Sequence, residues 1–256
     1  MAAAPLPPIS VPTPAPGPAP LSEGVRIIDT FIAPSRTFTD LRRSAAWWAP
    51  FLILAIVSGL FAYAVGQKVG WDKAAENVLQ TRPKQWDAIQ NQEPEQRQKS
   101  MQMAEKQTMI TAYAFPVINL ILLLIVAAAL MGTFKFGANA AVSYKVSLAI
   151  VFYASLAGAV RYLLATLALF AGMSPDGFNL QNPVATNLGA LVSVTEHPVL
   201  YAAGSMIDIF GIWTLVLTAI GFTCVSKVKR GTALAIVFGW YIAFMVLIVG
   251  LTSLAS

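Results

Sequence analysis

The feature that most constrains this chain is a series of five long apolar runs, each bounded by charged residues. The runs cover residues 48–67, 109–134, 146–172, 203–225 and 232–255. Each reaches the length of about 20 residues that a helix needs to cross a hydrocarbon layer. Because the apolar residues are continuous rather than alternating, they favour helices over barrel strands. We therefore predict an all-α, polytopic membrane protein built as a bundle of five transmembrane helices.

Composition agrees with this class, because 57% of the residues are hydrophobic and only 11% are charged. An ordinary soluble domain has about 25% charged residues. The single cysteine, Cys224, lies inside the fourth run, so it forms no intramolecular disulfide and belongs to no cysteine metal cluster. We expect it to be a packing residue, and we expect no metal and no cofactor.

Lys and Arg in short connections predict the orientation, because positive flanks are retained on the cytoplasmic side. With the N-terminus inside, the cytoplasmic face carries nine bases: Arg26, Arg36, Arg42, Arg43, Lys135, Lys145, Lys227, Lys229 and Arg230. The loop 68–107 is also basic, but it is long and nearly balanced by acids, and long loops cross with less regard to charge. We predict a cytoplasmic N-terminus and an outer C-terminus.

The segment before the first run is expected to hold a tail and two short helices. Residues 1–20 are rich in Pro and Ala and predict a disordered tail, and residues 21–256 predict one membrane domain. Ser22 is placed to cap a helix through Ile32. A second, amphipathic helix starts near Ser35 or Thr37, carries Phe38 and Leu41 on its apolar side, and is expected to lie along the membrane surface. Trp47 and Trp48 are predicted interfacial anchors.

The two outer loops differ in composition. Residues 68–107 predict short solvated helices, and the second half extends the second span outward. Acids and bases are interleaved there, so we expect no nucleic-acid partner. Residues 173–202 contain no Lys or Arg, and their uncharged segment Pro183–Val194 is expected to lie at the interface as a short helix or to cover the bundle mouth.

Intramembrane polar residues are the main candidates for function. Arg161 falls inside the third run, where a charge costs roughly 2.5–3.5 kcal/mol on insertion scales and normally faces the bundle interior. Asp208 enters the fourth run from the same side, and Asn119 lies near the same depth. We predict an Arg161–Asp208 pair with Asn119 nearby. The cluster is either a clamp between helices or part of a polar pathway.

Small residues recur at four-residue spacing in two runs, which lets helices approach closely. They are Ser58, Ala62 and Gly66 in the first run, and Gly231, Ala235, Gly239 and Ala243 in the last. Packing within the chain and homo-oligomer formation both explain the spacing. An enzyme is not expected, because the only histidine, His197, lies in an outer loop and no nucleotide or nucleophile motif is present.

Several short motifs resemble a known family. They are Pro34-Ser35 and Thr37-Phe38 followed by Leu41, Trp47-Trp48-Ala49-Pro50, Tyr153-Ala154-Ser155, Ile207-Asp208, Ile212-Trp213 and Gly221. Together they resemble the bacterial branch of the Yip family of five-span membrane proteins, from about Leu21 to the C-terminus. The resemblance implies a cytoplasmic N-terminus and, in eukaryotic members, work in vesicle traffic through Rab-type GTPases.

Two departures from that family bear on partners. The Asp-Leu-x-Gly-Pro motif of eukaryotic members is absent before the first run, and Leu156 stands where a proline often follows Tyr-Ala-Ser. A Rab-type GTPase is therefore not expected, and the resemblance favours a bacterial cytoplasmic (inner) membrane.

Two functions remain in view. The first is a non-enzymatic membrane protein that organises the bilayer or partner proteins, with a second copy or another membrane protein as its partner. The alternative is a small permease or channel whose polar path includes Asn119, Arg161 and Asp208. A wet cavity lined by Arg161 would favour the permease.

Overall fold

The computed structural model describes residues 19–176, 178–194 and 196–255, and every named element within them is a helix. The α-helices are α1 (Glu23–Ile32), α2 (Pro34–Asp40), α3 (Trp48–Lys68), α4 (Trp71–Gln80), α5 (Pro83–Gln90), α6 (Pro94–Gly132), α7 (Tyr144–Phe170), α8 (Pro198–Met206), α9 (Ile209–Val225) and α10 (Arg230–Ala255). A π-helical turn, η1 (Thr133–Gly137), continues α6, and a 3-10 turn, η2 (Leu188–Leu191), precedes α8. Most of the tail predicted over 1–20 lies outside the described residues.

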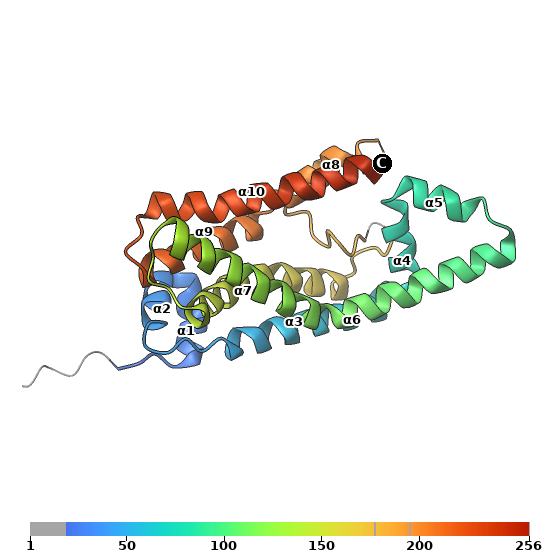
Figure 1. Ribbon diagram of the computed structural model, residues 1–256. Helices are drawn as coiled ribbons and strands as arrows, with labels where there is room; N and C mark the ends of the chain where they lie inside the picture. The colour runs from blue at the N-terminus through green and yellow to red at the C-terminus, as the bar shows by residue number, and fades with distance from the viewer. Residues whose placement is uncertain (1–18, 177, 195, 256) are drawn as a thin grey trace, which may run out of the picture.

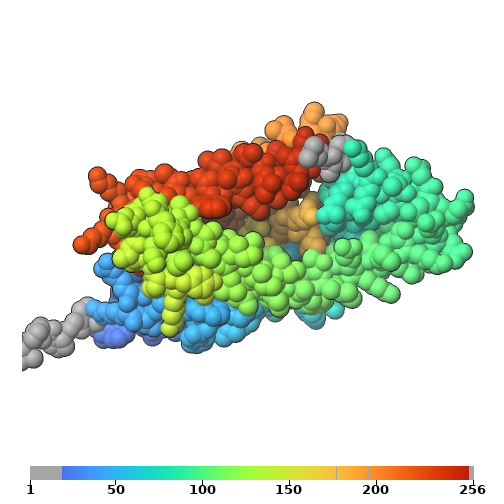
Figure 2. Space-filling model, viewed as in Figure 1, coloured from blue at the N-terminus to red at the C-terminus, as the bar shows by residue number. Residues whose placement is uncertain are grey.

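Four of the described helices are long and apolar enough to cross a membrane: α3, α6 with η1, α7 and α10. The predicted all-α, polytopic fold is confirmed. Helix α7 is the central element and packs against α3, α6 and α9, whereas α10 lies on the outside against α8 and α9 (Figure 1). Figure 2 shows the surface hollowed between α10 and α6.

The two ends of the bundle differ. One end holds α1, α2 and the turn between α9 and α10 (Figure 1), and we call it the basic end. Its exposed bases are Arg36, Arg42, Arg43, Lys135, Lys145, Lys227, Lys229 and Arg230. The other end, which we call the loop end, holds α4, α5 and the segment 171–197. Asn77 of α4 connects α4 to this segment by donating to the carbonyls of Pro175 and Phe178.

The fourth predicted span is not one helix. The structure divides residues 203–225 between α8 and α9, and the break falls at Ile207 and Asp208. The physical reason is that the Asp208 carboxylate accepts from the backbone N–H groups of Phe210 and Gly211, which makes it an N-cap that starts a new helix. Helix α9 has 17 residues, and the five-span count stays a prediction.

The second predicted span is longer than its apolar run. Helix α6 has 39 residues, so it measures about 58 Å and is roughly twice as long as a hydrocarbon layer is thick. Its first half projects from the loop end and packs against α4 and α5. The predicted outward extension of the second span is therefore present.

The two N-terminal helices form over the predicted residues, but the position predicted for the second one is wrong. Ser22 caps α1 by accepting from the Val25 N–H at 3.3 Å. Helix α2 does not lie with its apolar side on the membrane surface. Phe38 and Leu41 are fully buried and belong to the main core, and α2 packs against α9. The basic end of the bundle is thus closed by α2.

The two predicted anchors have different surroundings. Trp47 is half-buried and stacks on Phe152 of α7, with ring centroids 5.2 Å apart. Trp48 is 54% exposed at the start of α3. Trp47 is therefore a packing residue, and Trp48 alone keeps the exposure that an interfacial anchor needs.

The two strips of small residues also differ. In α3, Ser58 and Ala62 are buried, and a Cβ at Gly66 would meet the Trp71 indole at 2.9 Å. The strip of α10 is exposed at Gly231, Ala235, Gly239 and Ala243. Packing within the chain is therefore the correct interpretation for α3 and the wrong one for α10, and the homo-oligomer stays a prediction.

Two glycine substitutions should separate these environments. A Cβ at Gly221 of α9 would lie 2.4 Å from Ile150 and 3.1 Å from Phe38, whereas a Cβ at Gly239 meets nothing within 4 Å. We expect Gly221→Leu to cost about 2–3 kcal/mol through overpacking and Gly239→Leu to leave the melting temperature in detergent unchanged. Equal melting of the two variants would contradict the packing of α2 and α7 on α9.

Candidate functional site

The predicted Arg161–Asp208 pair is present but long. Arg161 of α7 and Asp208 at the start of α9 approach to 4.0 Å between Nη1 and Oδ2. The Asp208 side chain is 6% exposed and that of Arg161 is 22% exposed. The helices thus bring the two charges together at a distance beyond hydrogen bonding.

Other groups satisfy the Asp208 carboxylate. Its Oδ1 accepts from the N–H groups of Phe210 and Gly211 at 2.9 and 3.0 Å, and its Oδ2 accepts from the Thr186 hydroxyl. The positive end of the α9 dipole adds to this stabilisation. Asp208 is therefore first a helix cap, and its pairing with Arg161 is the weaker contact.

The loop before α8 supplies the backbone partners that the break in the helix needs. The Leu188 N–H donates to the Ile207 carbonyl at 3.3 Å, and the Ile209 N–H donates to the Thr186 carbonyl at 3.2 Å. A Cβ at Gly204 of α8 would lie 2.8 Å from the backbone nitrogen of Gly189, so this approach requires glycine. Irregular backbone at this depth persists because protein groups satisfy it.

Arg161 itself has few partners. Its Nη2 donates to the Tyr162 hydroxyl at 3.4 Å, and its guanidinium lies 5.2 Å from the centroid of the Tyr162 ring. A guanidinium carries five N–H donors. Among the described residues these contacts and the long pair with Asp208 are its polar partners.

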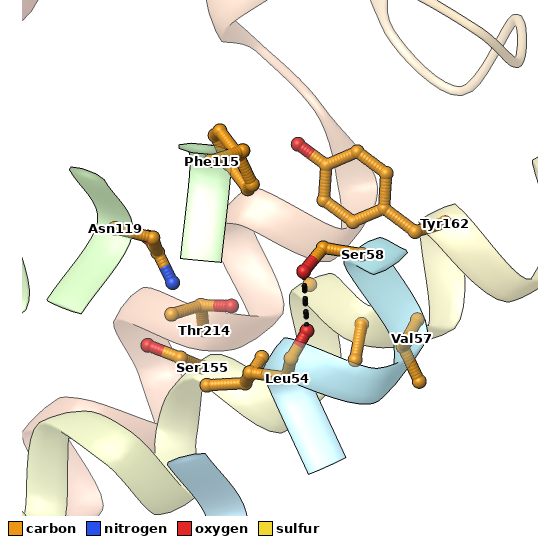
Figure 3. A pocket seen from close by; sticks show the side chains of 10 residues that line it. Leu54, Val57, Ser58, Phe115, Asn119, Ser155, Tyr162 and Thr214 are labelled. Atoms are coloured by element: carbon orange, nitrogen blue, oxygen red, sulfur yellow. Dashed lines mark hydrogen bonds between the residues drawn. The ribbon is translucent and has the colours of Figure 1, made fainter. Parts of the chain in front are cut away.

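Asn119 does not join the pair. It lines a cavity of about 170 Å³ between α3, α6, α7 and α9, together with Ser58, Ser155 and Thr214 (Figure 3). Neither Arg161 nor Asp208 lines that cavity. The predicted cluster of three is therefore a pair and a separate amide, because Asn119 faces the neighbouring space.

The cavity offers few free polar groups. The hydroxyls of Ser58, Ser155 and Thr214 each donate to a carbonyl one turn earlier in the same helix, at 2.8, 2.8 and 2.9 Å. A second cavity, of about 200 Å³, shares Ser58, Phe115 and Tyr162 with the first and continues toward Leu180 and Gln181 of the loop. Together they form a mainly apolar space along α6.

A buried ionic cluster at the basic end was not predicted from the sequence. Arg26 of α1 is 1% exposed and donates from Nε and Nη2 to Asp40 Oδ2 at 2.8 and 2.6 Å. Its Nη1 donates to Glu23 at 2.9 Å, and Glu23 also accepts from the Tyr153 hydroxyl of α7. The cluster fixes α1 to α2 and both to α7.

The Arg26 guanidinium stays charged in this setting. Burial lowers its pKa, but the hydrogen bond to Asp40 and the charges of Glu23 and Asp40 outweigh burial, so the pKa is raised overall. A sequence signal existed only for the Glu23–Arg26 spacing, because Asp40 is brought close by the turn at Ala33 and Pro34.

The four long, apolar helices define a multi-pass, helical membrane protein. The sequence model of the Yip1 domain matches residues 28–251, which is most of the chain. The chain therefore belongs to the Yip1 domain family, and the predicted Yip resemblance is confirmed. Comparison with curated proteins and with solved structures gave no match.

Proposed function

We propose that this Yip1-domain protein is a non-enzymatic scaffold of the bacterial cytoplasmic membrane that organises partner proteins at its basic end. The N-terminus and the basic end face the cytoplasm in this proposal, and the C-terminus lies outside. The supporting observation is the orientation of α1, which turns its polar side inward and its apolar side outward. Helix α1 buries the polar side chains of Arg26 and Asp29 and exposes the apolar side chains of Ile28 and Ile32.

The exposed face of the basic end suits a contact with another molecule. Ile28 is 59% exposed and Ile32 is 75% exposed, one turn apart on α1. The acids Glu23, Asp29 and Asp40 are in ion pairs with Arg26 or Arg36, so the exposed bases dominate the surface charge. An apolar row rimmed by bases is typical of a surface that binds a partner.

Photo-crosslinking in native membranes tests the proposal. A photoreactive residue at Ile32 should give protein adducts of discrete mass, and Ile28→Ser should reduce their yield at least tenfold. The matched control is a probe at Leu191, which is 85% exposed at the loop end. Identical adducts at both positions, or only lipid adducts at Ile32, would reject the scaffold. The test uses single substitutions rather than a deletion of α1 and α2, because Phe38 and Leu41 belong to the core.

A permease is the second candidate, because the helix broken at Asp208 is the kind of element that transporters use at their binding sites. The same protein reconstituted in liposomes discriminates the two functions. Solute flux that is lost in Arg161→Gln favours the permease, and flux equal to that of empty liposomes favours the scaffold.

A further inference from the structure

The surplus donors of Arg161 point to an anionic ligand. Asp208 lies at 4.0 Å, and both of its oxygens accept from other groups. The remaining polar contact of Arg161 among the described residues is a 3.4 Å bond to the Tyr162 hydroxyl. A charge in a membrane span normally has a close partner. The Arg161 side chain is 22% exposed, so a ligand can reach it.

An apolar space lies beside this cation. The guanidinium covers the ring of Tyr162, and the same ring lines both cavities, of about 170 and 200 Å³. Phe115 lines both as well, and the serine and threonine hydroxyls of the first cavity donate to carbonyls of their own helices. A base next to an apolar space complements a molecule with an anionic head and a hydrocarbon chain.

The position in the spans selects a lipid as the source of that molecule. Arg161 lies about 14 Å along the helix axis from Phe170, the end of α7 at the loop end. A long arginine side chain at this depth reaches toward the headgroups of the nearer leaflet. Arginine binds phosphate oxygens through paired N–H groups.

We propose that Arg161 binds the phosphate of an anionic phospholipid from the leaflet at the loop end, and that an acyl chain of this lipid enters the space lined by Phe115 and Tyr162. Asp208 caps α9 and keeps its own partners when the lipid binds. The site goes beyond the scaffold function, because it lies inside the bundle rather than on α1.

Native mass spectrometry of the full-length protein tests the site after exposure to vesicles of phosphatidylglycerol or of phosphatidylcholine. The wild type should retain phosphatidylglycerol at least fivefold better than phosphatidylcholine, and Arg161→Gln should abolish this preference. Gly158→Leu should reduce retention similarly, because Gly158 lines the first cavity and a Cβ there meets nothing within 4 Å. Lys229→Gln, an exposed base at the basic end, should retain the lipid as the wild type does.

Three results would overturn the proposal. The first is undiminished phosphatidylglycerol retention by Arg161→Gln. The second is undiminished retention by Gly158→Leu, which keeps the cation and decides the question even if Arg161→Gln fails to fold. The third is retention of inorganic phosphate by the wild type as strong as that of phosphatidylglycerol in the same measurement, since it would show that no acyl chain contributes.

Discussion

Asp40→Ala is expected to lower the free energy of unfolding by about 3 kcal/mol, near the lower end of the range for breaking a buried ion pair. The substitution leaves Arg26 buried at 1% exposure with Glu23 as its remaining acidic partner. It also removes the ion pair that holds α2 against α1, and Phe38 of α2 packs in the core beside Gly221. Thermal unfolding in detergent should show a melting temperature lower by roughly 6–12 °C.

An exposed ion pair provides the control for Asp40. Lys99 and Glu95 lie 2.6 Å apart on α6, but their side chains are 72% and 82% exposed. Glu95→Ala should therefore leave the melting temperature unchanged. Asp40→Asn keeps an acceptor for the Arg26 N–H groups and should fall between wild type and Asp40→Ala. Wild-type melting of both Asp40 variants would show that the cluster does not fasten α1 and α2.

The long helices were predictable because their apolar runs are continuous. The predicted spans 48–67, 146–172 and 232–255 agree to within two residues with α3, α7 and α10. The cap at Ser22 was also readable, since its side chain acts on a backbone group three residues away. In each case the deciding physics is local, or it is the simple avoidance of water by an apolar surface.

The features that the sequence did not reveal depend on distant contacts. Ile207 and Ile209 are apolar, so the sequence around Asp208 reads as one continuous apolar run and gives no sign of the helix break. The backbone groups at the break are hydrogen-bonded by Thr186 and Leu188, which lie about 20 residues earlier in the chain. Similarly, the sequence predicted that Phe38 lies on an apolar face, but it did not show what that face contacts. The lipid surface and the face of α9 at Gly221 are both apolar, so either could bury the Phe38 side chain. The choice between them is made by tertiary packing.

Asp208→Ala is expected to cost about 3 kcal/mol, because it removes the cap of α9, the acceptor of Thr186 and the acidic partner of Arg161 together. Asp208→Asn keeps an oxygen that can accept from the Phe210 and Gly211 N–H groups, so it should cost only about 1 kcal/mol. The difference between the variants measures how much of the role of Asp208 is capping. Thermal unfolding in detergent provides the measurement.

A double-mutant cycle then isolates the pair with Arg161. Because Nη1 and Oδ2 are 4.0 Å apart and Asp208 has other partners, Arg161→Gln and Asp208→Asn should combine with a coupling energy below about 1 kcal/mol. A tight clamp between α7 and α9 would instead give a coupling above about 2 kcal/mol and make Asp208→Asn as damaging as Asp208→Ala. Weak coupling would mean that the cation of Arg161 is free to bind another anion, whereas strong coupling would remove the basis for a ligand at this residue.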